Sequence, residues 1–123
     1  MKNKGKVFVI YSASGSWTDN YCLGQLELSG SDLLKIEAWR KCRAPVFSGT
    51  GRVISSGHAS FVKLPDGKEN WIVCHTAKHK GAGWARDVNI KKFTWDVDRN
   101  PSFKYSIAVV MINCMQEYYF SSS

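Results

Sequence analysis

The chain has 123 residues, of which 44% are hydrophobic, 22% charged and 13% aromatic. These values suit one small globular domain and exclude a disordered chain. The formal net charge of +7 favours contact with anions, but the lysines are scattered and no nucleic-acid-binding motif collects them, so we expect no nucleic-acid partner. The apolar runs 7–10 and 107–112 are too short for a signal-peptide core or a bilayer span, so the chain as given predicts neither export nor membrane insertion.

The cysteines give no sign of a metal or redox motif. No two of the four cysteines form a C-x-x-C pair, so a zinc site or a thioredoxin-like motif is unsupported. The four are Cys22, Cys42, Cys74 and Cys114. Disulfide pairing stays open. Cys74 and His75 are neighbours in a predicted strand and should point to opposite faces, which argues against a nucleophilic dyad.

The first half of the chain predicts a group of short strands. Residues 7–11 are β-branched or aromatic throughout, which is typical of a strand buried on both faces. Residues 21–28 alternate and predict a second strand after the turn residues 14–20. Ser31 is expected to cap a short helical turn, and a third strand is expected near residues 40–43.

The second half predicts another group. Residues 59–64 and 70–76 flank Pro65, Asp66 and Gly67 and form the clearest hairpin signal in the chain. Residues 86–95 alternate with a break of phase, which predicts a β-bulge at Lys91 and Lys92. Each group is about 45 residues long, the length of a propeller blade, and two blades alone cannot close a ring. Because the predicted elements in both groups are short strands, the fold class is predicted to be all-β.

The last residues differ in character from the rest. Residues 107–112 are apolar, and aromatic residues and three serines end the chain. We therefore separate residues 1–103 from a divergent tail, 104–123. Two alternatives stay open for this tail, an added strand that covers an exposed edge and a sequence foreign to the domain.

Three ordered motifs carry a resemblance to a known family. They are YSASGSWT with YCLG at residues 11–24, GHASFVK with PDGKENWIV at 57–73, and Arg86 with KFTWD at 92–96. At this spacing they resemble the arabinofuranosidase-like members of glycoside hydrolase family 43, over residues 6–103. The resemblance implies a five-bladed β-propeller, of which this chain would form a partial propeller of about two C-terminal blades.

The resemblance also implies an activity that this chain cannot perform alone. Members of the family cleave arabinose or xylose side chains from plant polysaccharides with inversion, which needs a general acid and a general base with room for a water between them. The resemblance places these carboxylates in earlier blades and in a Glu-Gly-Pro motif ahead of residues 7–11. No such motif is present, so we expect no catalytic residue here and no turnover by the isolated chain. The remaining carboxylates, such as Asp66, Glu69 and Asp96, are expected to serve turns and polar faces.

Three candidate site residues follow from the matched motifs. Arg86 and His75 match positions that line the sugar pocket, so they are predicted to bind an arabinose- or xylose-containing polysaccharide or oligosaccharide. His58 matches a histidine that faces the propeller axis and binds calcium or another ion, directly or through water. One imidazole cannot supply the six to eight oxygens that calcium takes, so calcium is implied for the intact fold only.

Several residues depart from the family's pattern and leave the substrate open. Cys74, Ala59 and the pair Ser55–Ser56 replace a Tyr, an Asn and a Gly-Pro, which changes the expected shape of the pocket. The family is often secreted, but this chain leaves the localisation open.

Two other functions were weighed. A noncatalytic carbohydrate-binding remnant would use Trp17, Trp39, Trp71 or Trp84 as stacking platforms for sugar rings. A basic nucleic-acid binder is supported by net charge alone.

Overall fold

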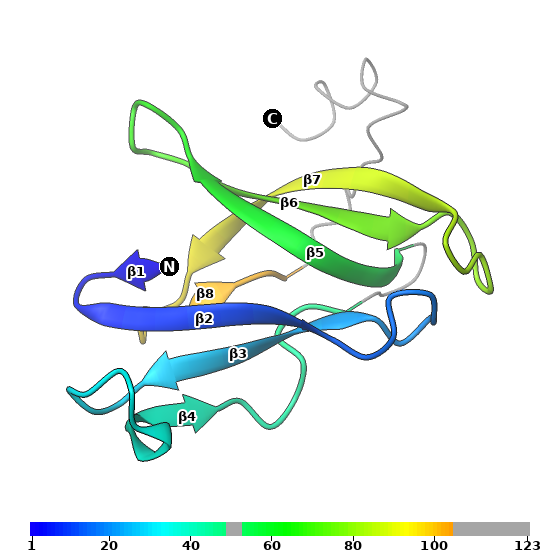
Figure 1. The fold of residues 1–123 in the computed structure, drawn as a ribbon. Coiled ribbons are helices and arrows are strands. Elements are labelled where there is room, and N and C mark those ends of the chain that lie inside the picture. Colours follow the sequence, from blue (N-terminus) through cyan, green and yellow to red (C-terminus); the bar gives the residue numbers. More distant parts are fainter. Residues whose placement is uncertain (49–52, 105–123) are drawn as a thin grey trace.

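The computed structural model describes residues 1–48 and 53–104, which form two four-stranded antiparallel sheets (Figure 1). The first sheet consists of β1 (Lys2–Asn3), β2 (Lys6–Ala13), β3 (Cys22–Leu28) and β4 (Trp39–Lys41), and a 3-10 turn (Ile36–Ala38) precedes β4. The second sheet consists of β5 (Ile54–Lys63), β6 (Asn70–Ala77), β7 (Arg86–Trp95) and β8 (Pro101–Ser102). Within each sheet every strand pairs with the next one in the chain, which confirms the all-β prediction and the two strand groups.

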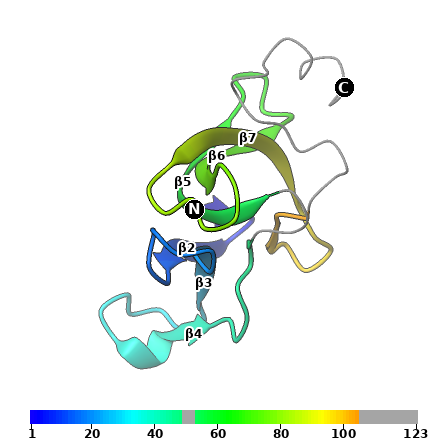
Figure 2. The same cartoon turned by 90° about the vertical axis from the view of Figure 1, so that its right-hand side faces the viewer.

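The second sheet lies against β2 and β3 of the first, and β4 lies away from it (Figures 1 and 2). Among the residues that the structure describes, no helix is long and apolar enough to cross a membrane. The predicted tail, 104–123, lies outside the described residues except for Lys104.

The prediction that β2 is buried on both faces is wrong. Phe8 is buried and its ring contacts Trp95 of the second sheet, at 6.2 Å between centroids. Ile10, on the same face, packs against the core. Val9 projects from the opposite face and is 41% exposed. The second sheet covers only one face of β2, and the apolar residues of the other face remain accessible.

The connection from β3 to β4 also differs from the prediction. The 3-10 turn begins at Ile36 with Lys35 as its N-cap residue, and no side chain caps it. Asp32 forms a local turn earlier, because its Oδ1 accepts the N–H of Leu34 at 3.0 Å. Ser31 is therefore not a cap. The third strand is present but begins at Trp39, one residue earlier than predicted.

The hairpin of β5 and β6 is confirmed. The N–H of Gly67 donates to the carbonyl of Leu64 at 2.8 Å, and the N–H of Leu64 donates to the carbonyl of Glu69 at 2.9 Å. Asp66 Oδ1 accepts the N–H of Lys68 at 3.0 Å. Gly67 has φ +72°, the left-handed conformation that glycine adopts without strain.

The predicted bulge at Lys91 and Lys92 is absent. The pairing of β6 with β7 runs without a shift from Asn70–Phe93 to Ala77–Arg86. Lys91 lies on the buried face together with Phe93, so the alternation of β7 is unbroken. The Lys91 ammonium donates to the carbonyl oxygens of Phe103, at 3.0 Å, and Lys104.

A hydrophobic cluster fills the space between the sheets. Its buried members are Leu23, Phe47, Ile72, Cys74, Phe93 and Phe103. Cys22, Cys42 and Cys74 are free thiols, and Cys114 lies outside the described residues. Burial raises the pKa of the Cys74 thiol to about 12, so it behaves as a small apolar side chain.

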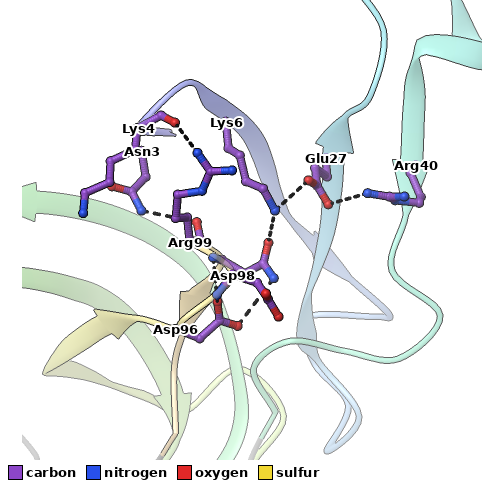
Figure 3. A network of polar contacts seen from close by, with 9 residues as sticks. Asn3, Lys4, Lys6, Glu27, Arg40, Asp96, Asp98 and Arg99 are labelled. Carbon is purple, nitrogen blue, oxygen red and sulfur yellow. Dashed lines mark hydrogen bonds and ion pairs between the residues drawn. The ribbon is translucent and has the colours of Figure 1, made fainter.

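A polar network joins the two sheets at one end (Figure 3). Lys6 of β2 donates to Asn100 Oδ1 at 3.0 Å, across to the turn between β7 and β8. Asn3 donates to the carbonyl of Arg99 at 3.3 Å, and Arg99 donates to the carbonyl of Lys4 at 3.1 Å. These contacts join turns that lie more than ninety residues apart in the sequence.

Candidate functional site

The first half of β5 departs from a regular strand. Its pairing with β6 shifts register between Ile54 and Gly57 and again between Gly57 and Ser60. Ser55 and His58 both have positive φ, +60° and +53°, a conformation that costs about 1–3 kcal/mol for such residues. Irregularities of this kind redirect side chains. Here His58 is exposed although its strand neighbour Gly57 is buried.

Tyr21 lies beneath this irregular segment. A Cβ placed at Gly57 would overlap the Tyr21 ring, so the close approach requires a glycine. Tyr21 is buried and stacks on His75 of β6 with 5.7 Å between centroids. The His75 ring lies in turn 5.5 Å from the His58 ring. Three rings from three separate segments thus form a row.

Arg86, at the start of β7, holds the row in place. Its Nε donates to His75 Nδ1 at 3.0 Å, and its Nη1 and Nη2 donate to Ser55 Oγ at 2.8 Å and Ser55 O at 2.7 Å. The guanidinium lies 5.5 Å from the centre of the Tyr21 ring. Ser55 Oγ donates onward to the carbonyl of Thr18 at 2.6 Å. Arg86 therefore connects β5, β6 and the loop before β3.

The electrostatics of the cluster favour a neutral His75. Burial lowers the pKa of His75, and the nearby charges of Arg86 and His58 lower it further. A guanidinium only donates, so His75 Nδ1 must accept and the neutral ring carries its proton on Nε2. Burial also lowers the pKa of Arg86, although Tyr21 and Asp19 oppose this shift, and arginine stays charged. The cluster therefore offers hydrogen-bond donors, which suit hydroxyl and carboxylate oxygens.

All three candidate residues predicted from the sequence, Arg86, His75 and His58, lie in this one cluster. Two contributors were missed. The sequence marks Ser55 as a departure from the family pattern and Tyr21 as part of a strand and of the YCLG motif, but it gives neither a role in the site. The aromatic residue that opens the YCLG motif was the available signal for Tyr21, but its partner lies about fifty residues away in the sequence.

The cluster does not by itself fit calcium. No group of three or more His, Cys, Asp or Glu side chains gathers anywhere in the ranges 1–48 and 53–104. His58 lies next to the imidazole of His75, with the Arg86 cation beyond it, and its backbone N–H donates to Ser12 Oγ at 2.9 Å. One hydroxyl does not supply the six to eight oxygen ligands that calcium takes.

The carboxylates considered in the sequence have structural roles. Asp66 closes the hairpin turn, and Glu69 pairs with Lys92 at 2.7 Å. Asp96 Oδ1 accepts the N–H groups of Asp98 and Asn100 at 2.9 Å, and these hydrogen bonds hold its pKa below the usual value although burial opposes them. None of these three lies in the Arg86 cluster.

Comparison with known proteins identifies the relatives of the chain. The sequence model of glycosyl hydrolases family 43 matches residues 1–101. An extracellular exo-alpha-(1->5)-L-arabinofuranosidase of Streptomyces avermitilis is 38% identical over 119 residues, which cover 88% of this chain and 24% of that protein. Alpha-L-arabinofuranosidase B of Pyricularia oryzae is 34% identical over 113 residues, 84% of this chain and 23% of that protein.

A solved structure shows the same fold. The alpha-L-arabinofuranosidase of Lactobacillus brevis superposes with a TM-score of 0.76 at 28% identity, over 87% of this chain and 35% of that one. The chain thus spans about a quarter of the curated relatives and about a third of the solved chain. The likeness confirms a partial propeller.

Proposed function

Because the chain belongs to glycosyl hydrolase family 43, we propose that it forms part of the sugar-pocket wall of an arabinofuranosidase-type glycosidase. The observation that carries this is the Arg86 cluster, in which a held guanidinium and a neutral imidazole present donors beside an exposed histidine. The names of both curated relatives point to an arabinose-containing substrate, a polysaccharide or an oligosaccharide. A xylose-containing substrate is the second choice.

Arg86 and His75 would bind and orient the sugar. Three of the five guanidinium N–H groups are used by His75 and Ser55, so two remain for sugar hydroxyls. The Nε2–H of neutral His75 adds a further donor. Hydrogen bonds in such a fixed frame position the sugar without a further ordering step.

The general acid and base would come from another part of the complete enzyme. Inverting hydrolysis needs two carboxyl groups that flank the scissile bond. Asp66, Glu69 and Asp96 have structural roles, and the role that we propose for the Arg86 cluster is to hold and orient the sugar. His58 would contribute one imidazole to a calcium shell whose oxygen ligands lie elsewhere in that enzyme. The curated relative from Streptomyces is extracellular, and we extend this localisation to the complete enzyme.

The test combines turnover and binding by the purified chain. We expect no hydrolysis of an aryl arabinofuranoside, and weak saturable binding of L-arabinose by calorimetry. Arg86→Ala should abolish that binding. Arg40→Ala is the matched control, because Arg40 is an exposed arginine on β4 that pairs with Glu27, away from the Arg86 cluster. Binding that survives in Arg86→Ala would contradict the proposal.

A noncatalytic carbohydrate-binding protein is the second candidate. It is favoured by the structural roles of the three carboxylates above. The two candidates differ in the complete protein, which would hydrolyse arabinofuranosides in the first case and only bind them in the second.

A further inference from the structure

Two tryptophans stand exposed next to each other. Trp17 is 58% exposed and Trp84 is 71% exposed, with 5.7 Å between ring centroids and a tilt of 41°. By contrast, Trp71 is partly buried, donates to Glu69 and lies beneath the Lys92 ammonium. Two exposed aromatic side chains in contact form a contiguous apolar patch, which is a feature of contact sites on folded surfaces.

The loops that carry the pair are held together. Asp19, in the loop between β2 and β3, accepts the N–H of Gly81, in the loop between β6 and β7, at 2.9 Å. Thr18 Oγ1 and the Thr18 N–H both donate to the carbonyl of Gly15, at 2.8 and 2.9 Å. The Trp17–Trp84 contact adds to this connection. The two rings therefore occupy defined positions on one joined rim.

The same rim borders the Arg86 cluster. Trp84 lies two residues before Arg86, which limits their Cα separation to about 7 Å. Trp17 directly precedes Thr18, whose carbonyl accepts the hydrogen bond from Ser55, and Ser55 accepts from Arg86. A ligand that extends out of the cluster would therefore meet the two indoles.

We infer that Trp17 and Trp84 form a second sugar subsite, which stacks on the furanose ring next to the one held by Arg86. This rests on the proposed function. A sugar ring has an apolar face of C–H groups that packs on an aromatic ring, while its hydroxyls stay in water. The pair itself carries no charge, which suits a neutral sugar. The role of the subsite is to favour oligosaccharides over the single sugar.

The experiment compares two sugars on the whole chain. L-Arabinose and α-(1→5)-linked arabinotriose are titrated by calorimetry into the wild type, Trp17→Ala, Trp84→Ala and Trp84→Phe. We expect the wild type to bind the trisaccharide about five- to tenfold more tightly than the monosaccharide. Each alanine variant should lose this preference and keep the affinity for L-arabinose. Trp84→Phe should retain most of it, because phenylalanine still stacks.

Each outcome decides the inference. A length preference that survives both alanine substitutions, or is absent from the wild type, overturns the subsite and leaves the proposed function intact. Self-association in sedimentation that Trp84→Ala abolishes would show that the pair binds a second copy instead. If the wild type binds neither sugar, the proposed function fails, and the subsite fails with it.

Discussion

Tyr21 has room beneath the candidate site only because residue 57 has no side chain. Its ring stacks on His75 and lies under the Arg86 guanidinium, so the position of the Tyr21 ring determines where both of these groups lie. Any side chain at position 57 must displace the ring or the strand. The geometry of the site therefore depends on one glycine, which pairs with His75 in the ladder between β5 and β6.

Gly57→Ala should both destabilise the chain and disturb the cluster. The added methyl group overlaps the Tyr21 ring, and overpacking of this kind costs about 1–3 kcal/mol. Urea denaturation measures the loss, and NMR ring-current shifts of His75 report the displaced ring. Ser60→Ala, an exposed position on the same strand, is the control and should change little. Unchanged stability together with unchanged His75 shifts would refute this account.

His75 should make the stability fall in mild acid. Its pKa is lower in the folded chain than its ordinary value of 6.5, owing to burial and then to Arg86 and His58. Below pH 6.5 the unfolded chain therefore binds more protons than the folded one, and the free energy of unfolding decreases as the pH falls. Protonation also removes the acceptor for Arg86.

NMR titration of the His75 ring is the direct measurement. We expect a midpoint below 6.5 in the wild type and a higher midpoint in Arg86→Met, which removes the neighbouring charge but leaves a long side chain. A wild-type midpoint at or above 6.5 would show that the described contacts do not govern this group.

The strands β5 and β7 show where sequence patterns succeed and where they fail. Alternation located both strands, but it placed an irregularity at Lys91 and Lys92, because Val88 and Ile90 fall on one phase of the alternation and Phe93 and Trp95 on the other. The strand is regular, and the second of these phases includes Lys91. The lysine instead faces inward, where carbonyl groups of Phe103 and Lys104 satisfy its ammonium. The actual register shifts lie in β5, where Gly57 packs on Tyr21 of the loop before β3 and the N–H of His58 donates to Ser12 of β2. Contacts between distant segments leave no periodic trace in a local sequence.

Because of Lys91, the free energy of unfolding should increase as the pH rises in mild alkali. Burial lowers its pKa from 10.5 to about 8, opposed by the Cys74 thiol. Above pH 8 the folded chain releases a proton that the unfolded chain still holds, so the free energy of unfolding increases. Cys74 acts in the opposite direction as the pH approaches 9, because the unfolded thiol loses its proton there while the folded thiol, whose pKa is about 12, keeps it.

The test is urea denaturation between pH 8 and pH 9. Lys91→Met should flatten the rise, because methionine fills a similar volume without a titratable group. Lys92→Met is the control, since Lys92 is exposed on the opposite face of β7. If the free energy of unfolding of Lys91→Met still rose with pH as in the wild type, the rise would come from another titratable group.

At the scale of the whole molecule, the two sheets are joined by the apolar cluster and by the polar network of Figure 3. Lys6 is the centre of this network, because it pairs with Glu27 of its own sheet and donates to Asn100 of the other, both at 3.0 Å. Arg40 also pairs with Glu27, but it reaches only within the first sheet. A comparison of substitutions at Lys6 and Arg40 therefore separates the stability that comes from contacts within the first sheet from the stability that comes from contacts between the two sheets.

Lys6→Ala should be more destabilising than Arg40→Ala. We expect a loss of about 1 kcal/mol for Lys6, since it removes both an ion pair and an intersheet hydrogen bond. Arg40→Ala should stay within about 0.5 kcal/mol, because exposed pairs contribute little. Chemical denaturation measures both variants. Equal losses would show that the intersheet contact adds nothing to stability.

Much of the molecule was predictable because its motifs are ordered. The resemblance singled out Arg86, His75 and His58, since the motifs fix which strands carry them, and the structure brings the three side chains together. The supporting contacts of Tyr21 and Ser55 were not predictable, because each depends on an irregular strand meeting a loop of the other sheet. Whether the three residues bind sugar and an ion stays a prediction.

The central claim, that these residues form part of a sugar-pocket wall, is tested most directly by an NMR titration of the labelled chain with L-arabinose. Because the donors of Arg86 and His75 are the groups proposed to hold the sugar, we predict saturable shifts that are confined to β5–β7 around these two residues and to the adjoining loops. Those shifts should vanish in Arg86→Ala and persist in Arg40→Ala. Saturable shifts located elsewhere, or none at any concentration of the sugar, would contradict the claim.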